Sequence, residues 1–196
     1  VQTCFETTLY VFTFLWTPLL QDAANATALA AGRSIENNAA EIPHGIIFST
    51  YMASMMSGSK IYAEMRAYFN ISDSLLLIVS FIVSLLSFIT ASWFQSALVV
   101  HMSFMAFELC CGIYFPSIST LRSPCIPESQ RATILSIFRI PLNVLVVSSI
   151  YIDFTNQTIC MICCVFMLVG LLCQVRFHLV DNTDYSNVQA SKDGGI

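Results

Sequence analysis

The sequence predicts an all-α membrane protein built as a bundle of six transmembrane helices. Of its 196 residues, 56% are hydrophobic and only 10% are charged, whereas a soluble domain carries charge on about a quarter of its residues. Six apolar runs each approach the ~20 residues that a helix needs to cross a hydrocarbon core ~30 Å thick. Lipid is therefore the expected solvent for most of the chain.

The six expected helices are separated mostly by short connections, so neighbouring helices should alternate in direction. They cover approximately residues 1–20, 44–66, 74–94, 97–119, 132–152 and 157–178. One long connection, residues 21–43, is rich in Ala and Asn and is expected to be a loop on the outer side. Residues 179–196 have almost no apolar content and are expected to form a disordered cytoplasmic tail. Because the apolar sequence starts directly at Val1, we expect a fragment of a longer protein.

The basic residues predict the orientation of the bundle. Seven of the eight Lys and Arg residues fall on the same side when the helices alternate, and only Arg33 falls on the other. Basic residues near helix ends are retained in the cytoplasm, so the C-terminus is expected there and the loop 21–43 outside. Asn25 begins the tripeptide Asn-Ala-Thr in that loop, which makes it a candidate glycosylation site.

Composition and motifs exclude several classes of function. The basic residues are too few and scattered for a nucleic-acid interface, and no nucleophile, base and orienting group occur in a pattern typical of an enzyme. Most of the cysteines lie inside apolar runs, where they behave as small hydrophobic residues. We therefore expect no metal site and no cofactor.

Ionisable residues within the apolar runs are the candidate functional residues, because each costs several kcal/mol unless it faces protein or water. Glu6 shares one polar face of the first helix with Tyr10 and Thr13. Glu108 lies near the middle of the fourth helix, with His101 two turns earlier on the same face. Either carboxylate is a candidate for proton coupling or for bracing a cavity. The alternatives are a structural hydrogen bond for Glu6 and simple solvation for His101.

The fifth helix carries Ser136, Arg139 and Asn143 on one face, with Pro141 in its interior. A proline there removes a hydrogen bond and kinks the helix. A guanidinium suits an oxyanion because it offers a planar fork of donors and stays charged. Arg139 is thus a candidate substrate or gate residue, and the alternative is a snorkelling anchor or a salt bridge at the inner gate.

Small residues recur every four positions along the second helix, at Gly45, Ser49, Ala53 and Ser57, and Ser54 and Gly58 are also small. This pattern is typical of a close helix–helix contact in a membrane. Lys60, near the inner end, is expected to anchor the helix at the interface.

Four segments resemble one transporter family. FLWTPLL (14–20), GIIFSTYMAS (45–54), ELCCGIYFPSISTLR (108–122) and IPESQRATILSIFRIPLN (126–143) are similar in order and spacing to the C-terminal half of the molybdate-anion transporters, a branch of the major facilitator superfamily. The resemblance covers nearly all of the chain up to about Phe177. Lys60, His101 and the loop 21–43 depart from the family pattern.

The resemblance implies that this chain is the C-terminal half of a twelve-helix major facilitator fold, partnered by an N-terminal six-helix half. It implies uptake of molybdate or a similar oxyanion by alternating access across the plasma membrane, and a fragment that is inactive alone. It also assigns importance to Glu6, Glu108, Arg139, Pro141 and Pro116, the last as a second helix kink. The alternatives are a membrane sensor or scaffold of the same fold that does not transport, and a transporter of a different small solute.

Overall fold

The computed structural model describes five helices. They are α1 (Gln2–Ala30), α2 (His44–Phe69), α3 (Asp73–Trp93), α4 (Ala97–Arg122) and α6 (Asn156–Asp193). The described residues are 1–32, 42–123, 130, 133–134, 136–137, 140, 143–144, 147 and 155–193, with side chains described through Val180 in α6.

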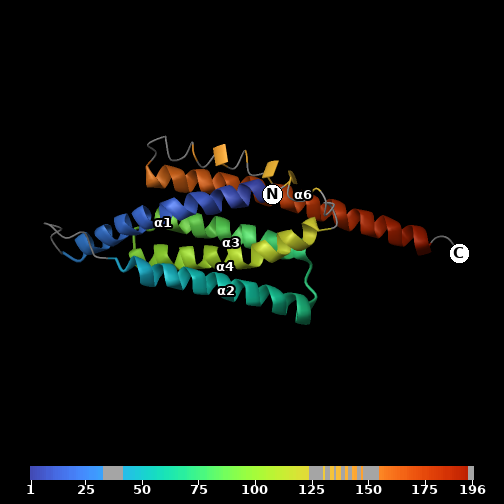
Figure 1. Cartoon of the computed structure of the whole chain (residues 1–196), viewed down its shortest axis with the longest axis horizontal. Helices are drawn as coiled ribbons and strands as arrows, with labels where there is room; N and C mark the ends of the chain where they lie inside the picture. Colours follow the sequence, from blue (N-terminus) through green and yellow to red (C-terminus); the bar gives the residue numbers. More distant parts are fainter. Residues whose placement is uncertain are drawn as a thin grey trace.

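The helices run side by side along one axis and alternate in direction from α1 to α4, as Figure 1 shows. Local signals fix the tight connections. Asn70 ends α2 in the left-handed conformation, with φ of 48°, and the Ser72 side chain caps α3 by accepting from the Leu75 amide. Residues 70–72 therefore turn the chain back within a single short connection.

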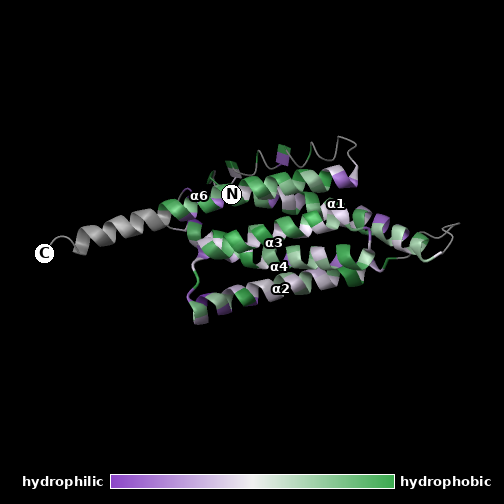
Figure 2. Cartoon of the chain, turned by 180° about the vertical axis from the view of Figure 1, so that it is seen from behind, coloured by the Kyte–Doolittle hydropathy of each residue, from purple (hydrophilic) through white to green (hydrophobic). Residues whose placement is uncertain are grey.

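The all-helical fold class is confirmed, and so is a membrane protein with several spans. Three helices of the described part of the chain are long and apolar enough to cross a bilayer, namely α3, α4 and α6 through Val180. The other two, α1 with 29 residues and α2 with 26, match them in length. Hydrophobic residues run along the helix bodies and hydrophilic ones gather near the helix ends, while α2 is paler than α3 (Figure 2).

Two helices are longer than the sequence analysis predicted. Helix α1 continues to Ala30, so the expected loop 21–43 is helical from Gln21 to Ala30. This stretch is rich in Ala, the best helix former, and the Gln21 side chain donates to Asn25 one turn later at 3.2 Å. Helix α6 continues to Asp193 instead of ending at 178 (Figure 1), because Gly and Pro are absent from that stretch until Gly194.

The expected fifth helix, 132–152, lies largely outside the described residues. Those described between 133 and 147 are helical.

The core forms where α1, α3 and α4 meet and is rich in aromatic side chains. Phe5 of α1 stacks on Tyr114 of α4 with ring centroids 3.8 Å apart and meets Phe81 of α3 edge-on at 5.3 Å. These three rings are fully buried. They hold the three helices together where lipid supplies no hydrophobic driving force between helices.

Helices α2 and α4 cross with their backbones in direct contact. A Cβ atom added to Gly58 would meet the carbonyl of Leu109, and one added to Gly112 would meet the carbonyl of Met55. The Ser59 hydroxyl also donates to the Gly112 carbonyl at 3.1 Å. Because each glycine has no side chain, the backbone of the opposite helix occupies the space where a Cβ atom would lie.

The expected close contact of small residues on α2 is confirmed for Ser54 and Gly58 and is wrong for the series that begins at Gly45. Ala53 and Ser57 are exposed, and Gly45 has nothing within 4 Å of where its Cβ would be. The buried small residues are Ser54 and Gly58. Two sets of small residues satisfied the same four-residue spacing, and only contact with α4 distinguishes them.

We expect Gly58→Ala and Gly112→Ala each to destabilise the fold by about 1–3 kcal/mol, because the added methyl group overpacks a backbone contact. Thermal unfolding in detergent, followed by size-exclusion chromatography, measures this. The matched control is Gly45→Ala on the same helix, which should leave the melting temperature unchanged or slightly raised. Equal melting temperatures for all three variants would contradict the proposed contact.

Candidate functional site

A cavity of about 310 Å³ lies between α1, α2 and α4, and we call it the α1–α2–α4 pocket. It is lined by Leu9, Tyr10, Phe12, Thr13, Trp16, Phe48, Tyr51, Met52, Met55, Glu108 and Phe115. Six of these residues are aromatic and one is charged. The α1 face that was predicted from the sequence to be polar contributes Tyr10 and Thr13. Glu108, a candidate functional carboxylate of the sequence analysis, also lines the pocket.

Glu108 is the charged group of this pocket. Only 4% of its surface is exposed. Among the described residues, none donates a hydrogen bond to its carboxylate or pairs with it, and the pocket lining holds neither Lys, Arg nor His. A buried carboxylate is costly unless it is paired or neutralised. Within the part of the chain that the structure describes, Glu108 is thus a buried carboxylate without a paired cation.

His101 does not line the pocket with Glu108, although both belong to α4. Its Nε2 lies 3.4 Å from the Thr50 hydroxyl and its Nδ1 lies 3.3 Å from the Tyr51 hydroxyl. Tyr51 therefore stands between the imidazole and the cavity. The role of His101 here is to tie α4 to α2 and to orient a ring of the pocket wall.

Glu6 lies apart from Glu108. Its carboxylate accepts from the Gln2 amide at 2.9 Å, and the Gln2 side chain in turn accepts from Arg122 at 3.0 Å. Because Arg122 ends α4, Glu6 belongs to a polar contact near the end of the bundle. This arrangement matches the structural hydrogen bond considered for Glu6 and does not bring the two carboxylates together.

The other sequence candidates are placed only in part. Ser136 and Asn143 are helical and exposed, whereas Arg139 and Pro141 lie outside the described residues. Pro116 is accommodated within α4, which continues to Arg122. Pro116 has no N–H for the Gly112 carbonyl, and that carbonyl instead accepts from the Ser59 hydroxyl of α2 at 3.1 Å.

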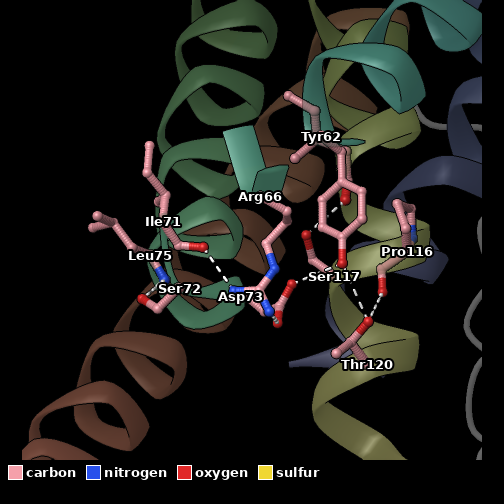
Figure 3. A network of polar contacts seen from close by, with 10 residues as sticks. Tyr62, Arg66, Ile71, Ser72, Asp73, Leu75, Pro116, Ser117 and Thr120 are labelled. Carbon is pink, nitrogen blue, oxygen red and sulfur yellow. Dashed lines mark hydrogen bonds and ion pairs between the residues drawn. The ribbon is translucent and has the colours of Figure 1, made fainter. Parts of the chain in front are cut away.

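A polar cluster at the α2–α3 turn was missed by the sequence analysis. Asp73, the first residue of α3, is 7% exposed and accepts from the Tyr62 hydroxyl at 2.9 Å. It also pairs with Arg66 at 3.5 Å, and Arg66 donates to the Ile71 carbonyl. The Tyr62 oxygen lies 3.2 Å from Thr120 of α4. Figure 3 shows how this Asp73 cluster joins α2, α3 and α4.

The neighbouring Ser74 extends this connection to α6. Its hydroxyl accepts from the Gln174 amide at 3.0 Å and lies 3.1 Å from Nδ1 of His178. Gln174 is 2% exposed. Two consecutive residues thus join the ends of four helices. The signal in the sequence was the Ser-Asp-Ser start of an apolar run, which was interpreted only as the edge of a helix.

Asn25, the candidate glycosylation site, lies within α1 and its side chain accepts from Gln21. The hydroxyl of Thr27, which a glycan acceptor tripeptide requires, donates to the Ala23 carbonyl at 2.7 Å and accepts from the Ala97 amide at 3.2 Å. Both sequon side chains are therefore engaged in the folded chain.

We expect Asp73→Ala to lower stability by about 1–3 kcal/mol, because it removes a buried acceptor that serves both Tyr62 and Arg66. The melting temperature in detergent is the measurement. Lys60→Ala is the control, since its ion pair with Glu64 is 4.0 Å long and its side chain is 80% exposed, and such pairs contribute little. A drop as large for Lys60→Ala as for Asp73→Ala would contradict this account.

Comparison with known proteins identifies relatives along almost the whole chain. The chain is 34% identical to a molybdate-anion transporter of Xenopus laevis over 205 aligned positions, which cover 98% of this chain and 42% of that protein. A protein of the same name from Xenopus tropicalis is 33% identical over 93% of this chain and 39% of its own length. One from Takifugu rubripes is 35% identical over 74% of this chain and 28% of its own length.

The chain spans about two fifths of the length of the two frog relatives it matches. No solved structure matches it significantly. A family model described as sugar transporters with 12 transmembrane segments matches residues 1–113, more than half of the chain. This is a family of transporters and not of enzymes, and its residues include α1, α2, α3 and the pocket carboxylate of α4. The chain therefore belongs to the MFS_5 family of sugar-transporter-like membrane proteins.

Proposed function

We propose that this chain is part of a secondary active transporter of an inorganic oxyanion, with molybdate uptake by alternating access as its activity. The observation that carries the proposal is the 34% identity, over 98% of the chain, to a protein named molybdate-anion transporter. In this proposal the chain supplies the C-terminal six of twelve helices, and an N-terminal half completes the cavity. The fragment alone does not transport.

In the proposed site, the predicted fifth helix contacts the oxyanion and α4 supplies a carboxylate. Arg139 contacts the oxyanion or guards its inner gate, assisted by Ser136 and Asn143 on the same predicted face. A guanidinium fork binds a tetrahedral oxyanion with two parallel hydrogen bonds. Glu108 takes up the coupled proton or braces the cavity, because it is the carboxylate that lines the pocket. Glu6 braces the inner end through Gln2 and Arg122.

The proposed location is the plasma membrane, with the C-terminus in the cytoplasm. Support comes from the alternating helices, which bring Arg66 at the end of α2 and Arg122 at the end of α4 to the same end of the bundle. Basic residues gathered at one end are typical of the cytoplasmic side.

A transporter of a different small solute is the second candidate, and the composition of the pocket favours it. The α1–α2–α4 pocket offers aromatic rings and one carboxylate, which do not by themselves attract a dianion. A non-transporting sensor with the same fold is the third, and it predicts binding without accumulation.

We expect Arg139→Ala to reduce molybdate uptake at least tenfold, because one charge-assisted bidentate contact contributes about 1.5–3 kcal/mol. The measurement is accumulation of radiolabelled molybdate by cells that express the complete twelve-helix protein. Lys60→Ala should transport like the wild type at equal surface expression, since Lys60 is exposed and outside the proposed site. Equal uptake by Arg139→Ala and the wild type would exclude Arg139 from the mechanism. An absence of molybdate uptake in the wild type would instead favour the other two functions.

A further inference from the structure

We propose that the α1–α2–α4 pocket is a binding site for a small organic cation that carries an ammonium group, with Glu108 as its counter-ion. This inference goes beyond the proposed function, since it concerns a second ligand and holds whichever oxyanion is transported.

The first step of the argument is charge. Only 4% of the Glu108 surface is exposed, and the described residues that line the cavity beside it include no basic residue. The titratable side chains that share the lining are Tyr10 from α1 and Tyr51 from α2. His101 is the basic residue on α4 nearest to the pocket wall, and it is turned to Thr50 and Tyr51. No described residue of the pocket supplies a positive charge to Glu108, so a cationic ligand is the counter-ion that we infer for it.

The second step is the aromatic wall. Trp16 meets Tyr51 edge-on with centroids 5.6 Å apart and lies 6.5 Å from Phe48 in a tilted arrangement. Phe12 closes the wall against Tyr51 at 6.0 Å. The wall on the α1 and α2 sides is therefore built of rings set at different angles to one another. An ammonium ion is attracted to such ring faces, most strongly to that of Trp.

The third step is size. A proton would neutralise Glu108, but it would leave about 310 Å³ of space between rings unfilled. This volume is at the lower end of the range of small-molecule sites. An organic cation satisfies the carboxylate with its ammonium group and fills the aromatic space with its alkyl groups. A hydrated metal ion fits less well, because the lining offers few oxygen ligands besides Glu108, Thr13 and the two tyrosines.

The test is equilibrium binding of radiolabelled choline to the complete protein, purified in detergent at neutral pH. The wild type should bind choline saturably, and tetramethylammonium should compete. We expect Glu108→Gln to weaken choline binding at least tenfold, because the amide keeps the shape and removes the charge. Glu64→Gln is the matched control, since it neutralises an exposed carboxylate on α2 and should bind choline like the wild type.

A second pair of variants locates the site. Trp16→Phe should weaken choline binding about threefold or more, since Phe offers a weaker cation–π face than Trp. Trp93→Phe, at a 73% exposed position outside the pocket, should leave binding unchanged. The elution profile and melting temperature of each variant establish that it is folded.

Three outcomes would overturn the proposal. They are no saturable choline binding by the wild type, equal binding by Glu108→Gln and wild type, and displacement of choline by molybdate as a direct competitor for the same pocket. If the wild type fails to bind choline, the charge of Glu108 is met by a proton. Molybdate uptake tests the proposed function independently. A wild type that binds choline but does not take up molybdate contradicts only the oxyanion proposal.

Discussion

The arrangement of this bundle depends on the backbone contact between α2 and α4. Gly58 and Gly112 each leave room for a carbonyl of the other helix, those of Leu109 and Met55, and no side chain larger than hydrogen fits there. In a membrane, where lipid is as apolar as the helix surfaces, such close packing is a main source of association. The contact also has a positional consequence. Met55 lines the pocket directly, and Leu109 is the chain neighbour of the lining residue Glu108. The close contact of the two helices therefore also positions Met55 and Glu108 in the pocket wall.

Away from this crossing, larger side chains separate the same two helices. Tyr51 and His101 meet between α2 and α4 about two turns beyond Gly58, and the ring of Tyr51 is part of the pocket wall. At the opposite end, the Asp73 cluster and Ser74 join α2, α3, α4 and α6 through side-chain hydrogen bonds. Polar groups at membrane depth need internal partners.

Sequence reasoning identified the helices well and their contacts poorly, for physical reasons. Apolar runs of about 20 residues have few alternatives to a helix in lipid, so α2, α3 and α4 were located to within a few residues. Periodicity defines faces but not the neighbour that covers them, which is why the small-residue pattern of α2 included exposed Gly45, Ala53 and Ser57 together with Ser54 and Gly58. Asp73 was missed because a charged side chain at the first position of a helix is usually exposed to solvent. Glu108 was singled out from the sequence and lines the pocket, yet its aromatic surroundings come from α1 and α2 and are not visible in one helix.

A cation beside Glu108 and an anion elsewhere in the cavity would support each other's binding. Two opposite unit charges about 10 Å apart attract by roughly 1–2 kcal/mol at an effective dielectric constant near 20, which is about a tenfold change in affinity. The coupling is reciprocal, because each ligand must raise the affinity of the other by the same factor. With the pocket empty, the Glu108 carboxylate repels a dianion at the same distance by about twice this energy, roughly 3 kcal/mol. A buried carboxylate that no described residue pairs with would therefore make binding of the proposed anion depend on the proposed cation, without any movement of the helices.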